Sequence, residues 1–167
     1  EYERALIAAL NAYIHPLVGR YLGRLRERLD AMGVAAPLYI TASNGGTLSL
    51  ESARNRPIDT ILSGPATGVV AAARLSGNSG PEKILTVDMG GTSCDMAVSQ
   101  AGEPEYTTRT TVGDFPLILP VVDITAIGAG GGSIVWVDSQ GLLKVGPESA
   151  GAEPGPACYG RGGERAT

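Results

Sequence analysis

Residues 84–98 read ILTVDMGGTSCDMAV, and this stretch decides the fold. The run before Asp88 is rich in Val, Ile, Leu and Thr, which predicts a buried strand. The run through Met96 to Val98 can pair with it antiparallel, and a Gly-Gly turn joins the two. The stretch therefore predicts a β-hairpin with a polar turn.

The turn of this hairpin has the composition of a phosphate site. Gly90 and Gly91 can adopt positive φ without a Cβ penalty, so successive N–H groups can point into one concavity that fits a phosphate. Thr92 and Ser93 add hydroxyl donors. An ordinary hairpin with a glycine turn explains the spacing equally well.

Two acidic residues, Asp88 and Asp95, flank the turn. Both would repel a bare phosphate, so their presence favours a divalent cation, or a water to be activated, held between them. The sequence therefore predicts a metal-nucleotide site in which Asp88 and Asp95 are the catalytic and metal-binding residues. The alternative is that these carboxylates only cap the hairpin.

The composition is that of a globular protein. The chain has 167 residues, of which 43% are hydrophobic and 18% charged, enough for one domain with a sizeable core. The net charge of −4 gives no basic footprint for nucleic acid or a membrane surface. Cys94 and Cys158 form no CxxC pair, and no signal-peptide pattern is visible, so we expect a cytoplasmic protein.

Both ends of the sequence are abrupt. It begins with EYER, as though already inside a helix, and it trails off at GERAT. We expect a single-domain fragment of a longer subunit, with a helical lead-in over residues 1–33, an α/β core over 34–145 and an irregular Pro/Gly-rich tail over 146–167.

The lead-in predicts two helical segments. Helical character over residues 1–11 is interrupted at His15-Pro16, because a residue before proline is driven out of the α region. Residues 17–32 resume as an amphipathic helix, and Gly33 supplies its C-terminal stop. His15 is the only histidine, which excludes a His-based triad or zinc cluster built from this chain alone.

A second polar turn follows a strand predicted over residues 37–41. It contains Ser43, Asn44, Gly45 and Gly46, and open α/β sheets place ligands at such strand ends. These four residues are a secondary candidate site. A polar glycine turn without a ligand accounts for them equally well.

Further elements are predicted on either side of the central hairpin. A helix over residues 64–75 has Pro65 at its first position, and its small residues would let another element approach closely. Residues 106–112 are threonine-rich and predict a third strand, which makes a meander with the hairpin.

Residues 128–133 read GAGGGS. This is no dinucleotide fingerprint, because Ser133 stands where a glycine should be and a strand follows instead of a helix. The glycines leave backbone amides free to approach a ligand closely, so binding is favoured over a bare turn. The expected ligand contacts are Gly128, Gly130, Gly131, Gly132 and Ser133.

These motifs occur in one order: SNGG at 43–46, SGPATG at 63–68, DMGGTSCD at 88–95 and IGAGGGS at 127–133, followed by GPESAGAEPGPACYG at 146–160. The set resembles the hydantoinase A and oxoprolinase family over essentially the whole chain. That family is similar to the actin, sugar-kinase and chaperone ATPase superfamily. The resemblance implies an α/β, ribonuclease-H-like fold, with a mixed sheet of antiparallel hairpins flanked by helices.

The resemblance also implies roles and cofactors. Asp88 and Asp95 would help hold Mg²⁺ or a water, residues 90–93 would contact the β- and γ-phosphates of ATP, and residues 128–133 would meet either the nucleotide or the organic substrate. Family members use ATP to activate an amide or carbonyl oxygen. The implied activity is hydrolysis of a cyclic amide (a hydantoin, 5-oxoproline or another lactam) or carboxylation of a ketone.

The chain also departs from the family pattern. It lacks the second Asp-Gly-Gly-Thr-type hairpin of the longer family subunit, so we expect little turnover from this polypeptide alone. The implied partners are further N- and C-terminal parts of the same subunit, a hydantoinase B-type subunit and a small-molecule substrate. A small-molecule kinase of the same superfamily and a non-catalytic nucleotide-binding or docking module are the alternatives.

Overall fold

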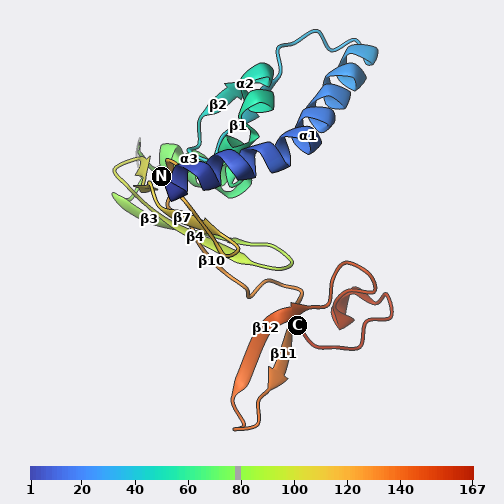
Figure 1. The fold of residues 1–167 in the computed structure, drawn as a ribbon. Helices are drawn as coiled ribbons and strands as arrows, with labels where there is room; N and C mark the ends of the chain where they lie inside the picture. The colour runs from blue at the N-terminus through green and yellow to red at the C-terminus, as the bar shows by residue number, and fades with distance from the viewer. Residues whose placement is uncertain (78–79) are drawn as a thin grey trace. The chain divides into compact units, whose positions relative to one another are not determined.

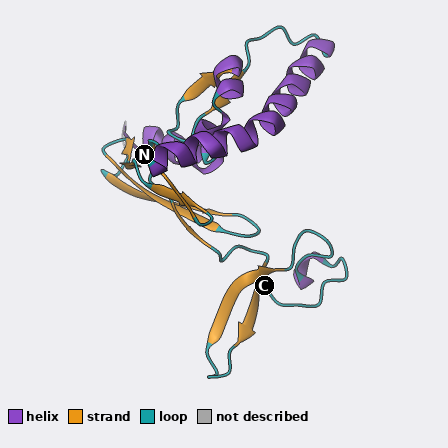
Figure 2. Ribbon diagram, in the orientation of Figure 1, coloured by secondary structure: helices purple, strands orange, loops and turns teal. Residues whose placement is uncertain are grey.

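The computed structural model describes residues 1–77 and 80–167, which form helices and mostly antiparallel hairpins (Figures 1 and 2). The chain separates into two compact units. One is formed by Glu1–Ile84 and Val98–Asp123, the other by Leu85–Ala97 and Ile124–Thr167. The single-domain fragment expected from the sequence stays a prediction. No helix in the described ranges combines the length and apolar character needed to cross a bilayer.

The first unit begins with one long helix, α1 (Tyr2–Ala31). The predicted interruption at His15-Pro16 is wrong, because Pro16 lies inside the helix. Pro16 has no N–H, so the Ala12 carbonyl four residues earlier lacks its helical hydrogen bond. Both residues are exposed, so water can donate to that carbonyl instead. Figure 1 shows that α1 changes direction along its length, as helices containing proline do.

The end of α1 is the predicted glycine stop. Gly33 has φ of +76°, its N–H donates to Asp30 O at 3.0 Å, and the Val34 N–H donates to Leu29 O at 2.9 Å. These two bonds close the last turn in a Schellman motif. The predicted apolar stripe is only partly covered, since Leu22 is buried and its neighbour Tyr21 is exposed.

The rest of this unit up to the hairpin comprises β1 (Tyr39–Thr41), β2 (Thr47–Ser49), α2 (Leu50–Asn55), the 3₁₀ helix η1 (Pro57–Thr60) and α3 (Ser63–Gly77). Its core is built from Ile58, Leu117, Leu119 and Val121, and Ile7, Leu10 and Ile14 of α1 pack against it. Full burial of aliphatic side chains of this size contributes about 1.5–3 kcal/mol each. This cluster therefore holds α1 onto the unit.

Helix α3 packs closely, as its small residues predict. It starts at Ser63, two residues before Pro65, and its Ala66 and Ala73 are fully buried. A Cβ on Gly77 would lie 2.9 Å from Gly102 Cα. The backbone at the end of α3 therefore lies against the backbone of the turn at Gly102.

The predicted single strand over residues 106–112 is wrong. The segment splits into β6 (Tyr106–Thr107), which pairs with β9 (Val121–Val122), and β7 (Thr110–Val112), which pairs with β8 (Phe115–Leu117). The short strand before it, β5 (Glu103–Pro104), pairs with β4 (Cys94–Gln100). Thr107 Oγ1 accepts the Arg109 N–H at 3.1 Å and donates to Arg109 O at 3.0 Å. A threonine side chain that bonds the local backbone in this way ends a strand.

The central hairpin forms as predicted from β3 (Lys83–Met89) and β4 (Cys94–Gln100), which pass through both units. Strand β10 (Thr125–Ile127) lies on the other side of β4, antiparallel to it. The expectation that β3 is buried is wrong, since Leu85 is 62% exposed and Val87 58%. Leu85 and Val87 point to one face of the strand and alternate with the half-buried Ile84 and Thr86, so the described residues leave that face largely uncovered.

The second unit also contains the hairpin of β11 (Ser133–Val137) and β12 (Leu143–Ser149). The strand predicted to follow the GAGGGS run is confirmed as β11. The tail predicted to be irregular is partly regular, since β12 continues to Ser149 and a 3₁₀ helix, η2 (Ala157–Tyr159), follows. The Val135 N–H donates to Ala166 O at 3.0 Å and ties the C-terminal residues to β11.

Candidate functional site

The turn of the central hairpin, residues 90–93, is tight. The Gly90 N–H donates to Ser93 O at 2.9 Å. Neither Gly90 nor Gly91 has a positive φ, and a Cβ added at Gly91 would meet open space. The expected positive φ is therefore absent, and the missing side chain at Gly91 leaves the space beside the turn open.

This turn presents several donors that the protein itself does not use. Among residues 1–77 and 80–167, no acceptor receives the N–H groups of Gly91, Thr92 and Ser93. Gly91 and Thr92 are exposed, and Ser93 is half-buried. Three successive backbone donors beside two hydroxyl groups form the kind of concavity that binds phosphate oxygens.

The two carboxylates lie on the strands just outside the turn. Because Gly90 pairs with Ser93, counting back two residues on each strand places Asp88 opposite Asp95. Neither forms an ion pair with a basic side chain in the described parts of the chain. Like charges opposite each other on neighbouring strands repel, and a divalent cation between them would relieve that repulsion.

The donor set fits Mg²⁺ with help from a ligand. The described residues contain no group of three or more His, Cys, Asp or Glu side chains suited to a metal. Mg²⁺ in nucleotide sites takes one or two carboxylates and completes its shell with phosphate oxygens and water. The pair at Asp88 and Asp95 meets that requirement, and a metal bound there would depend on the nucleotide.

The glycine loop, residues 128–133, lies against this turn within the second unit. The Gly131 N–H donates to Gly90 O at 2.9 Å, and the Gly132 N–H donates to Gly91 O at 2.7 Å. The structure thus brings together the two segments that the sequence predicts as one site. Gly130 packs so closely that a Cβ there would lie 2.6 Å from Thr92 N.

The N–H groups of residues 129–133 in the glycine loop are not free, which differs from the expectation. The Ala129 N–H donates to Ile127 O at 2.9 Å, the Gly130 N–H to Ser133 Oγ at 2.9 Å, and the Ser133 N–H to Gly130 O at 2.9 Å. With Gly131 and Gly132 bonded to the turn, no backbone donor from 129 to 133 is left for a ligand. A direct ligand contact of this loop stays a prediction.

The secondary candidate turn belongs to the first unit and has a structural role. Ser43 is buried; its N–H donates to Asp59 O at 2.8 Å, and its Oγ accepts the Leu62 N–H at 3.1 Å. Gly45 has φ of +77°, and a Cβ there would lie 2.3 Å from Val70 Cγ2. These two residues fix the junction between the turn and its neighbours.

Three residues of this turn border a small cavity of about 210 Å³. Asn44, Gly45 and Gly46 line it together with Arg74, Glu103 and Tyr106. Asn44 Oδ1 accepts the Gly46 N–H at 3.0 Å. Sequence reasoning missed Arg74, Glu103 and Tyr106, because no local pattern connects a helix residue to the β5–β6 segment. The only signal was one arginine in an alanine-rich helix.

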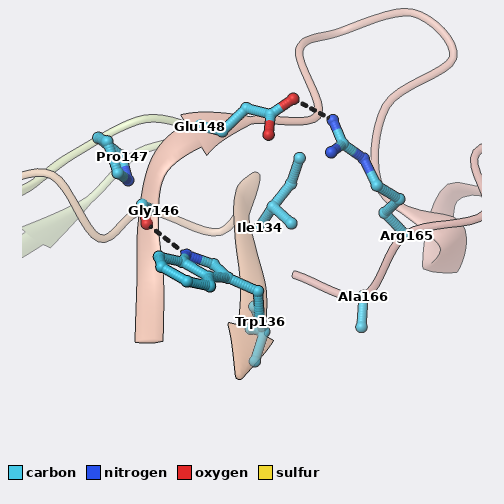
Figure 3. A pocket seen from close by; sticks show the side chains of 8 residues that line it. Ile134, Trp136, Gly146, Pro147, Glu148, Arg165 and Ala166 are labelled. Carbon is cyan, nitrogen blue, oxygen red and sulfur yellow. Dashed lines mark hydrogen bonds and ion pairs between the residues drawn. The ribbon is translucent and has the colours of Figure 1, made fainter. Parts of the chain in front are cut away.

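A larger cavity of about 410 Å³ lies in the second unit (Figure 3). Ile134 and Trp136 come from β11, and the Trp136 Nε1–H donates to Gly146 O at 2.8 Å. Glu148 pairs with Arg165, and the hydrogen bond from this guanidinium, followed by its charge, lowers the pKa of Glu148. The sequence predicted none of these residues as site residues.

Comparison with known proteins gives a consistent result. The sequence matches the family described as Hydantoinase/oxoprolinase over residues 4–167. It is 38% identical to caprolactamase subunit alpha from Pseudomonas jessenii, over 100% of this chain and 24% of that subunit. It is 38% identical to the 5-oxoprolinase PfmaA from Pestalotiopsis fici, over 96% of this chain and 12% of that protein.

Two solved structures are similar in fold. The crystal structure of ATP-dependent caprolactamase from Pseudomonas jessenii has a TM-score of 0.82 at 38% identity. The match covers 100% of this chain and 24% of the caprolactamase chain. A nucleotide-free structure of acetone carboxylase, an enzyme of ATP-dependent acetone carboxylation, has a TM-score of 0.71 at 32% identity. The match covers 87% of this chain and 20% of the acetone carboxylase chain. The predicted α/β fold of the ribonuclease-H-like ATPase type is confirmed. The chain spans about a quarter or less of these proteins.

Proposed function

Since the chain belongs to the hydantoinase/oxoprolinase family, we propose that it carries a phosphate-binding hairpin of an enzyme that uses ATP to activate a cyclic amide for hydrolysis. Two relatives, the caprolactamase and the 5-oxoprolinase, bear the names of lactams, which supports a lactam as substrate. The likeness to acetone carboxylase supports carboxylation of a ketone as the second candidate.

One observation carries the proposal. Residues 91–93 present three successive N–H groups that have no acceptor in the described chain, and two carboxylates face each other just behind them. A turn with only a structural role gains nothing from opposing like charges. A site for a metal-bound phosphate needs both features.

Each group has a distinct task in the proposed reaction. The N–H groups of Gly91 and Thr92 bind phosphate oxygens, and the Thr92 and Ser93 hydroxyls add donors. Asp88 and Asp95 hold Mg²⁺, which when bound neutralises charge on the transferred phosphoryl group. Phosphoryl transfer depends mainly on such positioning and charge stabilisation. Transfer of the phosphoryl group to the amide oxygen would activate the otherwise unreactive ring amide, so that a nucleophile can attack its carbonyl carbon.

The rest of the enzyme comes from elsewhere in the proposed assembly. The chain spans 24% of caprolactamase subunit alpha, which supports further parts of the same subunit and a hydantoinase B-type partner as contributors to the site. Cys94 and Cys158 are both free thiols, and this supports the reducing interior of the cell as its location.

The test is calorimetric titration of the complete protein with Mg-ADP and Mg-ATP. Asp88→Ala and Gly91→Val should each weaken binding by about tenfold or more, equivalent to about 1.4 kcal/mol. Asp114→Ala, which removes an exposed carboxylate from the β7–β8 turn, is the matched control and should bind as the wild type does. Wild-type affinity in both hairpin variants would mean that the hairpin has only a structural role.

The reaction type needs a separate measurement. Product analysis with lactams and with ketones, in the presence of ATP, distinguishes ring opening from carboxylation. Release of ADP with an opened ring supports the amide hydrolase, and ATP-dependent incorporation of bicarbonate into a ketone supports the second candidate. A phosphorylated small molecule as the stable final product would contradict both.

A further inference from the structure

Two backbone carbonyls of the phosphate hairpin are held by the glycine loop. Gly90 O accepts the Gly131 N–H and Gly91 O accepts the Gly132 N–H, at 2.9 and 2.7 Å. In a planar trans peptide, the C=O of one residue and the N–H of the next point in opposite directions. Fixing these two carbonyls therefore turns the N–H groups of Gly91 and Thr92 away from the glycine loop.

The fit between the two segments is too close for any side chain at two positions. A Cβ on Gly130 would lie 2.6 Å from Thr92 N and 2.7 Å from Gly91 C, which are atoms of the peptide that carries the Thr92 N–H. A Cβ on Gly132 would lie 2.8 Å from Gly91 O. By contrast, a Cβ on Gly131 would lie 3.8 Å from Gly90 O, an ordinary contact.

The loop is also held in its own shape. The buried Gly130 N–H donates to Ser133 Oγ at 2.9 Å, and Ser133 itself is 1% exposed. The Ala150 N–H donates to Gly132 O at 2.7 Å and ties the loop to the residue after β12. Each backbone N–H from Ala129 to Ser133 is thus bonded inside the unit, so the segment that supports the hairpin is held by its own hydrogen bonds.

From these contacts we infer that Gly130, Gly132 and Ser133 are positioning residues. They aim the Gly91 and Thr92 amides at the phosphate without touching the nucleotide themselves. The inference rests on the proposed phosphate site at residues 90–93. Binding groups that are oriented before the ligand arrives lose less entropy on binding, so disturbing the support should weaken phosphate contacts selectively.

The test compares ADP with AMP on the complete protein, because AMP lacks the terminal phosphates that the hairpin would hold. In Gly130→Ala, affinity for Mg-ADP should fall by about tenfold or more while affinity for AMP changes by less than about twofold. Gly131→Ala adds a methyl group to the same loop without a clash and is the matched control. It should weaken ADP binding less than Gly130→Ala does. Partial unfolding would lower both affinities by the same factor, since it reduces only the competent fraction.

A second variant covers the case in which Gly130→Ala fails to fold. Ser133→Ala adds no atoms and removes the acceptor of the Gly130 N–H, so it should lower the ADP-to-AMP affinity ratio in the same direction by a smaller factor. An unchanged ratio in both variants, or a larger ADP defect in Gly131→Ala than in Gly130→Ala, overturns the inference. No ADP binding by the wild type, or unchanged binding in Gly91→Val, overturns the proposed function and this inference with it. If Gly91→Val loses ADP binding but Gly130→Ala keeps the wild-type ADP-to-AMP affinity ratio, only the inference is overturned and the proposed function stands.

Discussion

The carboxylates of Asp88 and Asp95 are a like-charged pair on neighbouring strands of the hairpin. Counting back from the Gly90–Ser93 hydrogen bond places them opposite each other, and no basic side chain in the described chain forms an ion pair with either. Such a pair costs stability in the free protein. A cation that binds between them recovers that cost, so metal binding and stability are linked at this site.

Replacing one of these carboxylates should therefore separate stability from binding. Asp95→Asn should stabilise the magnesium-free protein by about 0.2–1 kcal/mol, because it removes one of two like charges. The variant should also lose most of the rise in melting temperature that Mg-ATP gives the wild type. Differential scanning calorimetry measures both, with Asp114→Asn as the control. A variant that is less stable without magnesium and keeps the full ligand shift would contradict the shared metal site.

Glu148 makes a pH-dependent contribution to the second unit. The Arg165 guanidinium donates a hydrogen bond to this carboxylate and attracts its charge, which lowers the pKa of Glu148 from its ordinary 4.5. A lowered folded-state pKa stabilises the protein above pH 4.5, and that contribution disappears as the pH falls through the lowered value. Both groups are exposed, so the effect on stability is small and weakens with salt.

The shift is best measured at the residue itself. A ¹³C NMR titration should give Glu148 a pKa below 4.5, and Arg165→Ala should return it towards that value. Arg161→Ala, which removes a nearby arginine that stacks on Tyr159 instead, should leave the Glu148 titration where it is. Equal titration curves in the wild type and Arg165→Ala would show that the pair does not form in solution.

At the scale of elements, the sequence predicted those whose cause is local. The β3–β4 hairpin follows from apolar runs around a glycine turn, and α3 from small residues after Pro65. Two of the errors, at Pro16 and at residues 106–112, also have local causes. Pro16 is tolerated inside α1 because the carbonyl it frees is exposed, and the Thr107–Arg109 side-chain bonds end β6. Exposure and side-chain geometry decide both cases, and neither can be read from sequence periodicity.

The turn after β1 depends on the glycine at position 45. Gly45→Ala should lower the free energy of unfolding by about 2–5 kcal/mol, because the methyl group collides with Val70 at 2.3 Å and φ is positive. Gly113→Ala also places a side chain at positive φ, +58°, but in open space, so it should cost only about 1–2 kcal/mol. Urea unfolding measures the two. Adding Val70→Ala should recover part of the loss at Gly45, and equal losses at Gly45 and Gly113 would rule out the collision.

At the scale of the whole molecule, most of what sequence reasoning missed depends on contacts between distant segments. The GAGGGS run predicts a ligand loop because glycines leave amides free, yet its Gly131 and Gly132 amides are bonded to the hairpin. The division of the chain into two packing units is likewise set by long-range contacts. Sequence patterns locate the segments of a site, whereas the role of each segment depends on which other segment it packs against.

Residues 90–93 are proposed to bind the phosphates of a nucleotide. Hydrogen–deuterium exchange of the complete protein, with and without Mg-ADP, tests this proposal most directly, because the Gly91, Thr92 and Ser93 amides have no acceptor in the described chain and should exchange quickly until a phosphate occupies them. Mg-ADP should slow exchange most strongly in the peptide covering 90–93, and Gly91→Val should remove this effect. Slowed exchange elsewhere, with 90–93 unchanged, would contradict the proposal.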